Sequence, residues 1–416
     1  MEIPIQYSEG MKINKYFPFV VIYFFLNSIA LPFGLLYTMI LTPVFYAWIA
    51  IKGKKYILVK FLLFFAPFII FHIRNGVDTF FYFRSIVIYF TTYIFCYAFY
   101  TLITTYNGME TFFNRIVKIN FILTLVALLF VTSSYRNLFW FDWSIVVNGL
   151  SIENWPRLQL FTYEPSYYST LLAPVFAFYF IKFLLSSSDK SATTNLLLVT
   201  FSLILSLSMG VIASIMLTIP ILFATSAGRF LGQKRIFYSF FIAIALLLVS
   251  AATLYVFYPN NPFFVRILAI ITGNDASANG RTYEAFFLAN KVAEEKSVWW
   301  GVGFGQLKII GDAIIKEFYN IPATGGQVSI PCAVAETYAL TGFVGVGLRL
   351  MAEIFFFFKT KVFDNYYRTF LFIYVFIYQF TGSFTTNIAE YVIWILAFTN
   401  IFPMFDKGVQ TETGDN

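Results

Sequence analysis

The stretch "NLLLVTFSLILSLSMGVIASIMLTIPILFATS", residues 195–226, indicates that this chain folds in a lipid bilayer and how it crosses the bilayer there. A membrane-spanning helix needs about 20 consecutive, mostly apolar residues, so this run is too long for one ordinary span. The pentapeptide "SLSMG", Ser206 to Gly210, interrupts the run near its middle. The stretch therefore predicts two short membrane helices joined by a sharp reversal.

The composition of the whole chain agrees with a bilayer environment. Hydrophobic residues make up 59% and charged residues 12% of the sequence, and the mean hydropathy is +0.74. An average soluble domain has roughly 45–50% apolar and 25% charged residues. The chain of 416 residues is therefore expected to be an integral membrane protein, with room for roughly a dozen spans and one modest region outside the lipid.

Apolar runs separated by polar breaks predict an all-α polytopic membrane protein with about twelve transmembrane helices. We expect one transmembrane domain over residues 1–416, with both termini on the same side and two longer polar segments at about 133–164 and 259–328. The expected helices span residues 16–30, 33–51, 56–73, 80–104, 116–132, 166–186, two within 195–226, 236–258, 330–358, 367–381 and 387–405.

Basic residues orient this set of helices. In the alternating topology, one side receives 13 lysines and 4 arginines, and the remainder of the chain has 4 lysines and 7 arginines. Cytoplasmic loops carry the excess of Lys and Arg, so the first side and both termini are predicted to be cytoplasmic. The two polar segments then face outward.

Arginine dominates over lysine on the predicted outer side. A guanidinium presents a planar fork of donors that suits bidentate contacts with phosphate. These side chains could pair with lipid headgroups and loop acids, but as a set they favour an anion-binding outer face. They are Arg74, Arg84, Arg136, Arg157, Arg266 and Arg281.

The net charge of +7 does not point to nucleic acid, because the basic residues are dispersed between hydrophobic segments. Cys96 and Cys332 lie far apart in apolar segments, and His72 is the only histidine. Neither a disulfide framework nor a metal site is expected from these residues.

The two polar segments have different patterns. Segment 133–164 mixes three tryptophans with polar residues, which fits either an aromatic belt at the membrane interface or a surface that stacks on sugars. Segment 259–328 predicts a helix from near Arg281 to Trp299 and another at about 306–320. Between them "WWGVGFGQ" brings three glycines together. They predict a tight turn with close backbone approach; the alternative is that their N–H groups help to bind an anion.

Three motifs together resemble the Wzy/WaaL superfamily of bacterial O-antigen polymerases and ligases. They are "R…FTYEPSYYS" at the start of the helix at 166–186, "SLSMGVIASIML" at 206–217, and "NGRTYEAFFLANKVAEEKSVWWGVGFGQ" followed by "IPCAVAETYALTGFVGVGL". The pattern covers roughly residues 150 to 350. Met209 stands where the superfamily frequently has an arginine.

This resemblance implies a GT-C type glycosyltransferase of the bacterial cytoplasmic (inner) membrane that works without metal or other cofactor, with its active site on the periplasmic side. A polymerase moves a growing glycan from undecaprenyl diphosphate onto the next lipid-linked repeat unit, and a chain-length regulator is a possible partner. A ligase moves the glycan to lipid A–core, but its pattern includes a histidine late in the outer loop, and His72 lies elsewhere. A polymerase is therefore the preferred hypothesis. A flippase or other transporter of lipid-linked oligosaccharide is the alternative from another class.

The motifs also suggest roles for single residues. Arg157 and Arg281 are expected to stabilise the leaving diphosphate, and Glu164 is expected to act as general base. Glu164 precedes Pro165, which suits the first turn of a helix, so its alternative role is to cap that helix.

Further candidates for contact with the substrate or its diphosphate lie nearby in the sequence or on the same predicted side of the membrane. They are Arg84, Arg266, Tyr163, Tyr167 and Glu336. Arg349 and Glu353 are four residues apart and are expected to form a structural pair on one helix face. Glu390 is expected near the outer end of its helix, where it is a further candidate to line the site.

Overall fold

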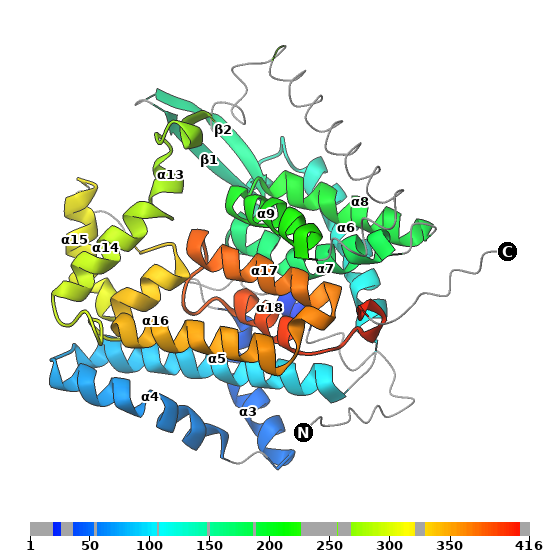
Figure 1. Cartoon of the computed structure of the whole chain (residues 1–416). Coiled ribbons are helices and arrows are strands. Elements are labelled where there is room, and N and C mark those ends of the chain that lie inside the picture. The colour runs from blue at the N-terminus through cyan, green and yellow to red at the C-terminus, as the bar shows by residue number, and fades with distance from the viewer. Residues whose placement is uncertain are drawn as a thin grey trace. The chain divides into compact units, whose positions relative to one another are not determined.

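The computed structural model describes residues 20–25, 36–53, 56–105, 108–147, 150–185, 189–225, 256, 268–320 and 329–407, with backbone alone at 143–147, 150–155, 276 and 277. The described chain is mostly helical (Figure 1). It divides into two compact units. Unit 1 consists of Met1–Ile116, Phe161–Tyr163 and Gly280–Asn416, and unit 2 of Val117–Leu160 and Glu164–Asn279.

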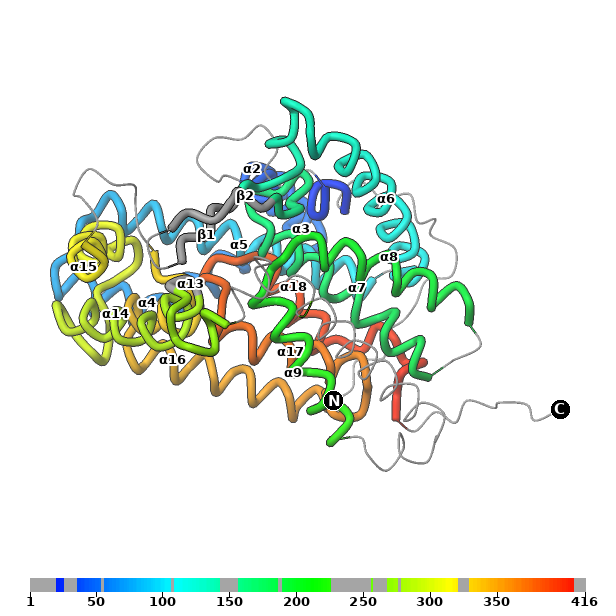
Figure 2. The backbone as a smooth tube through the Cα atoms, turned by 90° about the horizontal axis from the view of Figure 1, so that it is seen from above, coloured from blue at the N-terminus to red at the C-terminus, as the bar shows by residue number. Residues whose placement is uncertain are grey.

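Unit 1 contains the first and last helices of the described chain. Its elements are η2 (Val21–Phe25), α2 (Tyr37–Ile40), α3 (Thr42–Ile51), α4 (Ile57–Arg74), α5 (Thr79–Thr105), the first residues of α6 (Met109–Leu129), α14 (Tyr283–Glu294), η5 (Gln306–Lys308), α15 (Ile310–Phe318), α16 (Ala333–Lys359), η6 (Val362–Asp364), α17 (Tyr366–Thr381), α18 (Ile388–Phe398) and η7 (Pro403–Phe405). Helices α16, α17 and α18 pack side by side (Figure 2).

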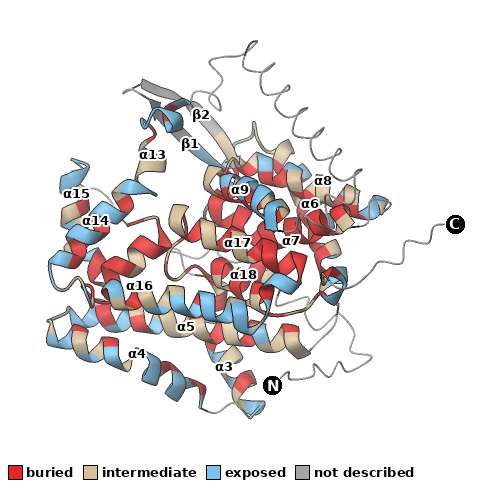
Figure 3. Ribbon diagram, viewed as in Figure 1, coloured by how far each residue is buried: buried red, intermediate tan, exposed pale blue. Residues whose placement is uncertain are grey.

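Unit 2 contains the rest of α6 and the middle of the chain. Its further elements are η4 (Arg136–Leu138), strands β1 (Trp140–Val147) and β2 (Leu150–Leu158), α7 (Pro165–Leu185), α8 (Lys190–Ser206), α9 (Met209–Thr225) and α13 (Ala276–Asn279). Helix α7 packs against both α8 and α9. It is buried around its whole circumference over most of its length (Figure 3), as expected for a helix that is apolar on every side.

Among the described residues, five helices are long and apolar enough to cross a membrane, by length and composition alone: α4, α5, α6, α7 and α16. Helices α3, α8, α9 and α18 are shorter but also apolar. Helix α4 exposes large apolar side chains such as Leu63, Phe64 and Ile70 on one face, which suits contact with lipid. These features define a multi-pass membrane protein.

The predicted reversal at "SLSMG" is confirmed. Helix α8 ends at Ser206 and α9 begins at Met209, and Leu207 between them has a left-handed backbone with φ of 46°. The expected helix at 33–51 is divided at Leu41 into α2 and α3. The expected helix at 236–258 lies outside the described residues except for residue 256, and that at 16–30 is described only at 20–25.

A β-hairpin departs from the predicted all-α fold. Strands β1 and β2 pair antiparallel, with Trp140 opposite Leu158 and Val147 opposite Leu150. The Trp140 indole donates to the carbonyl of Ala127 at 2.7 Å, which joins the start of the hairpin to the end of α6. Part of segment 133–164 is therefore extended. Its aromatic residues were interpreted as either an interfacial belt or a surface that stacks on sugars, and the same residue types also favour strands.

Helix α16 is interrupted at Gly342, whose φ of 64° and ψ of −165° are not helical. Residues 298–303, which we call the splice segment, pair with the backbone on both sides of this break. The N–H groups of Phe343 and Val344 donate to Val298 and Trp299 at 3.0 and 3.1 Å, and those of Val302 and Gly303 donate to Ala339 and Leu340 at 2.9 and 3.0 Å. Because backbone groups at membrane depth need partners inside the protein, the splice segment makes the break tolerable there.

The glycines of "WWGVGFGQ" permit this close packing. Gly301, Gly303 and Gly305 all have positive φ. A Cβ on Gly301 would lie 2.3 Å from the carbonyl carbon of Leu340, and one on Gly305 would lie 2.3 Å from the carbonyl oxygen of Phe81. The predicted close backbone approach is confirmed. The N–H groups of Gly301 and Gly303 donate to protein carbonyls, so the anion-binding alternative is not supported for these two.

Side chains fasten the same region to the turn between α4 and α5. His72 Nε2 lies 2.7 Å from the carbonyl oxygen of Trp300, and because a carbonyl only accepts, this nitrogen is the donor. His72 Nδ1 lies 3.1 Å from the Tyr82 hydroxyl. The Gln306 amide accepts from the N–H of Asp78 at 2.9 Å and donates to its carbonyl at 3.1 Å. The only histidine of the sequence therefore holds the backbone of the splice segment itself, at Trp300.

Candidate functional site

The candidate site in unit 2 is built on buried polar side chains where α6, α7 and α8 meet. The Tyr168 hydroxyl donates to Asn120 Oδ1 at 2.7 Å, and Asn120 Nδ2 donates to the Ser202 hydroxyl at 2.9 Å. Thr124 Oγ1 lies 3.1 Å from the same hydroxyl. All four side chains are buried. Polar groups within apolar helices are costly unless they are paired, and they often mark functional regions.

Arg157 connects β2 with the end of α8. Its Nε donates to the carbonyl oxygen of Ser206 at 3.1 Å, and Ser206 is the last residue of α8. The final carbonyls of a helix lack partners within the helix and favour a cation. The reversal after Ser206 therefore presents an acceptor that positions the guanidinium.

Ser206 also joins this arginine to the start of α7. The Ser169 hydroxyl donates to Ser206 Oγ at 2.7 Å and is also placed 2.8 Å from the carbonyl oxygen of Pro165. Consecutive hydrogen-bonded residues thus lead from Arg157 through Ser206 and Ser169 to the residue beside Glu164. Two motifs separated in sequence, "FTYEPSYYS" and "SLSMG", are in direct contact.

Glu164 lies immediately before the first residue of α7. Its backbone carbonyl accepts from the N–H of Tyr168 at 3.1 Å, and its carboxylate accepts from the Ser166 hydroxyl. Pro165 opens the helix as predicted. Glu164 is half-buried, and Tyr167 is buried. The predicted position at the helix entrance is confirmed; its role as base or cap stays a prediction.

The other candidates lie in unit 1 or outside the described chain. Arg281 is half-buried two residues before α14, and Arg84 is exposed on α5. Tyr163 is half-buried. Glu336 lies in the first turn of α16, where its Oε2 accepts from the N–H of Thr385 at 2.7 Å. Arg266 lies outside the described residues. Arg157, Glu164 and Tyr167 therefore share the α7–α8 neighbourhood in unit 2.

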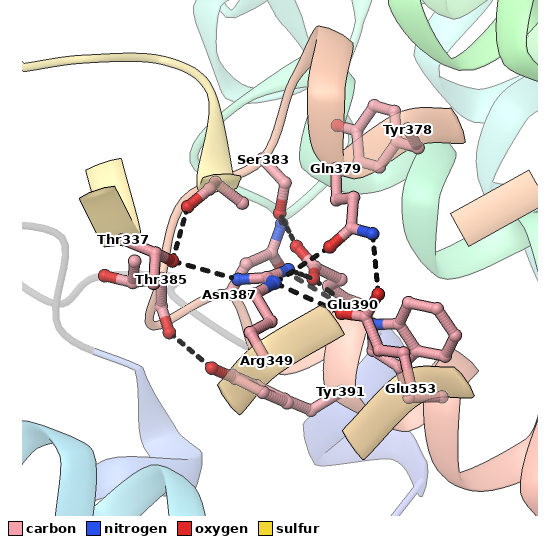
Figure 4. A network of polar contacts seen from close by, with 12 residues as sticks. Thr337, Arg349, Glu353, Tyr378, Gln379, Ser383, Thr385, Asn387, Glu390 and Tyr391 are labelled. Atoms are coloured by element: carbon pink, nitrogen blue, oxygen red, sulfur yellow. Dashed lines mark hydrogen bonds and ion pairs between the residues drawn. The ribbon is translucent and has the colours of Figure 1, made fainter. Parts of the chain in front are cut away.

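A second polar cluster, in unit 1, surrounds Arg349 (Figure 4). The predicted pair with Glu353 is confirmed, with Arg349 Nε 3.2 Å from Glu353 Oε1. Arg349 also forms an ion pair with Glu390 of α18 and donates to the Gln379 amide oxygen of α17 at 2.8 Å. Its Nη1 donates to the Thr337 hydroxyl at 3.3 Å. The sequence spacing predicted only the first of these contacts.

The sequence analysis also missed the buried polar side chains where α6, α7 and α8 meet in unit 2. Asn120 in "IVKINFILTLV" and the pair Ser202 and Ser206 in "FSLILS" are polar residues inside apolar runs. Such residues usually face the interior of a helix bundle. The four-residue spacing of the two serines places them on one helix face, so this signal was present in the sequence.

No protein-family model matches this chain, and no curated protein matches it.

Proposed function

We propose that the protein is a polysaccharide polymerase that transfers a growing glycan from undecaprenyl diphosphate onto a lipid-linked repeat unit. The observation that carries this proposal is the contact of two motifs on which the resemblance rests: Arg157 of one is hydrogen-bonded to Ser206 of the other. Residues with the expected chemistry, a guanidinium and a carboxylate, thereby share one neighbourhood at the start of α7.

The proposed reaction is a single displacement. The acceptor hydroxyl attacks the anomeric carbon, the bond from that carbon to the diphosphate oxygen breaks, and the acceptor proton passes to Glu164. Arg157, with Arg281 as a second candidate, stabilises the charge on the departing undecaprenyl diphosphate. Inversion at the anomeric carbon follows from one displacement without a covalent intermediate. The proposed reaction uses no metal.

The proposal includes a topology. About twelve helices span the bacterial inner membrane, both termini are cytoplasmic, and the site faces the periplasm. In this orientation Glu164 lies at the outer edge of the bilayer, where a lipid carrier presents its diphosphate. The remaining candidates, Arg84, Arg266, Tyr163, Tyr167 and Glu336, would contact the glycan or its diphosphate.

The test uses the purified full chain in nanodiscs with lipid-linked repeat units, in the presence of a metal chelator. We expect a ladder of longer glycans. Glu164→Gln should slow the reaction by about 10²- to 10⁴-fold, the usual contribution of a general base. Arg157→Lys should slow it by about 10²- to 10³-fold, because lysine lacks the bidentate fork.

Arg115→Lys is the matched control, since Arg115 is exposed on α6 and lies on the predicted cytoplasmic side, away from the proposed site. It should leave the ladder unchanged. Full activity in Glu164→Gln would remove that residue from the base role. Product on lipid A–core without a ladder would instead identify a ligase.

A transporter of lipid-linked oligosaccharide is the second candidate, because one observation favours it. Helix α16 is broken at Gly342 and has a buried charged cluster, and discontinuous helices of this kind form the substrate sites of many transporters. The test measures the movement of a fluorescent lipid-linked saccharide across proteoliposomes. Movement without any change in glycan length would replace the polymerase with this function.

A further inference from the structure

The cluster around Arg349 contains more negative than positive charge. Arg349 contacts two carboxylates, Glu353 and Glu390. The side chains are 13%, 8% and 2% exposed, respectively. One guanidinium therefore faces two carboxylates in a part of the chain built from apolar helices. A buried charge without compensation is strongly unfavourable, so this cluster requires one further positive charge.

The surrounding described groups do not supply that charge. Tyr391 of α18 and Glu336 of α16 lie near Arg349, and Cys96 of α5 lies near Tyr391. The ionisable groups that face the cluster, taken over all the elements packed against it, are Glu336 on α16, Tyr391 on α18, Tyr89 and Cys96 on α5, and Cys332 before α16. None of these groups carries a positive charge in any protonation state. Lys308 of η5 is the cation beyond them, and it acts on the Glu336 carboxylate, whose charge it offsets.

The two carboxylates differ in how well they are held as anions. Glu390 accepts from Arg349 Nη2, from the Ser383 hydroxyl at 2.5 Å and from the Trp394 indole at 3.3 Å. It also lies in the first turn of α18, where the helix dipole favours a negative charge. Glu390 is therefore the permanent partner of Arg349.

The surroundings of Glu353 stabilise its anionic form less well than those of Glu390. Glu353 shares Arg349 Nε with the Gln379 amide oxygen, at 3.2 Å against 2.8 Å, and its second oxygen accepts from Gln379 Nε2 at 2.8 Å. The Gln379 amide oxygen has a second lone pair, so it can accept a hydrogen bond from the O–H group of a neutral Glu353 while it keeps its hydrogen bond from Arg349. The surroundings of Glu353 thus suit a carboxylic acid.

We propose that Glu353 is a proton-binding site inside the membrane-spanning part of unit 1, and that its proton neutralises this carboxylate and leaves Arg349 and Glu390 as a balanced ion pair. The proton comes from water, binds one carboxylate oxygen and leaves the same way, and no other bond changes. This proposal does not rest on the glycosyltransferase function.

The site is connected to the break in α16. Arg349 Nη1 donates to the Thr337 hydroxyl at 3.3 Å, and Gly342 lies between these two residues in the sequence. The guanidinium that pairs with Glu353 therefore also links the two halves of α16. Loss of the proton from Glu353 would place a negative charge beside the Arg349–Thr337 hydrogen bond, which spans the break at Gly342.

The test compares thermal unfolding of the full chain, purified in detergent, across a pH series. A proton held by the folded chain and released on unfolding gives stability that is present at low pH and lost as pH rises through the folded-state titration. We expect the wild-type Tm to fall on the alkaline side. Glu353→Gln, a neutral isostere, should lack this fall and exceed the wild type there, whereas Glu390→Gln should be less stable at every pH.

Asp312→Asn is the matched control. Asp312 and Lys316 form another i,i+4 pair, at 2.8 Å, with one cation for one carboxylate. Its substitution should leave the shape of the pH profile unchanged. If Glu353→Gln keeps the wild-type fall in Tm, the proposal is wrong. It is equally wrong if sodium, but not choline at the same ionic strength, removes the fall, because the missing charge would then be a metal cation.

Infrared difference spectroscopy of the wild type keeps the proposal testable even if Glu353→Gln does not fold. The spectrum between acidic and alkaline buffer should contain the C=O stretch of a buried carboxylic acid, shifted in deuterated water and lost on the alkaline side. Where the variant folds, this band should be missing from it. Absence of the band from the wild type would overturn the proposal.

Discussion

Gly342 is the residue on which the course of α16 depends most directly. Its φ is 64°, and a Cβ at this position would lie 2.2 Å from the carbonyl carbon of Trp299. Gly342→Ala therefore combines backbone strain with a clash against backbone that cannot rotate away. We expect it to lower the free energy of unfolding by about 3 kcal/mol or more, measured by denaturation of the purified protein in detergent.

Gly347→Ala provides the comparison within the same helix. A Cβ on Gly347 meets nothing within 4 Å, and alanine is the better helix former. The change should leave stability unaltered or raise it by up to about 1 kcal/mol. Equal effects of the two substitutions would show that the splice segment does not pack against Gly342 as described.

Single residues differ in how far the sequence predicted their partners. Arg349 and Glu353 were paired correctly because four residues separate neighbours on one helix face. Glu390 lies 41 residues from Arg349, and Arg157 lies 49 residues from Ser206, so no local spacing encodes those contacts. The glycines predicted a close backbone approach, but not that the partners would be α16 for Gly301 and α5 for Gly305.

Among the elements, α8 offers a test of capping and its dependence on pH. Asp189 Oδ1 accepts from the N–H groups of Ser191 and Ala192 at 2.9 and 3.1 Å, and Oδ2 lies 3.1 Å from Lys182 Nζ. The Ala192 N–H, followed by Lys182, lowers the pKa of Asp189. A lowered pKa means that this stabilisation is present above the ordinary pKa of the carboxyl and is lost as pH falls through the folded-state value.

Asp189→Ala should therefore cost about 1 kcal/mol at neutral pH, with a smaller difference from the wild type in acid. Asp189→Asn should cost less, because asparagine also caps helices well. Denaturation of the three proteins at neutral and acidic pH measures both effects. A constant difference between Asp189→Ala and the wild type across pH would contradict an ionised cap.

The positions of many elements were predictable because apolar runs and polar breaks mark helices of a membrane protein directly. The predicted helices at 56–73, 80–104 and 166–186 correspond closely to α4, α5 and α7. The hairpin of β1 and β2 was missed, since its tryptophans suit both a membrane interface and a strand. The break in α16 was missed because its apolar pattern continues through Gly342.

At the scale of the whole molecule, the proposed orientation can be tested by labelling. Tyr135 is 68% exposed between α6 and β1, and Lys190 is exposed at the start of α8. In spheroplasts, Tyr135→Cys should react with a membrane-impermeant maleimide. Lys190→Cys should react only after permeabilisation, and the parent protein with its two native cysteines gives the background. The reverse pattern would place Glu164 on the cytoplasmic side and exclude the proposed polymerase.

The splice segment has a consequence for biogenesis. Without it, the carbonyls of Ala339 and Leu340 and the N–H groups of Phe343 and Val344 would enter lipid unpaired, at a cost of several kcal/mol each. Residues 298–303 leave the ribosome before α16, so the segment that pairs with this helix is already synthesised when α16 reaches the translocon. Helix α16 should therefore insert stably only together with the segment that precedes it, as a hairpin-like unit and not as an independent span.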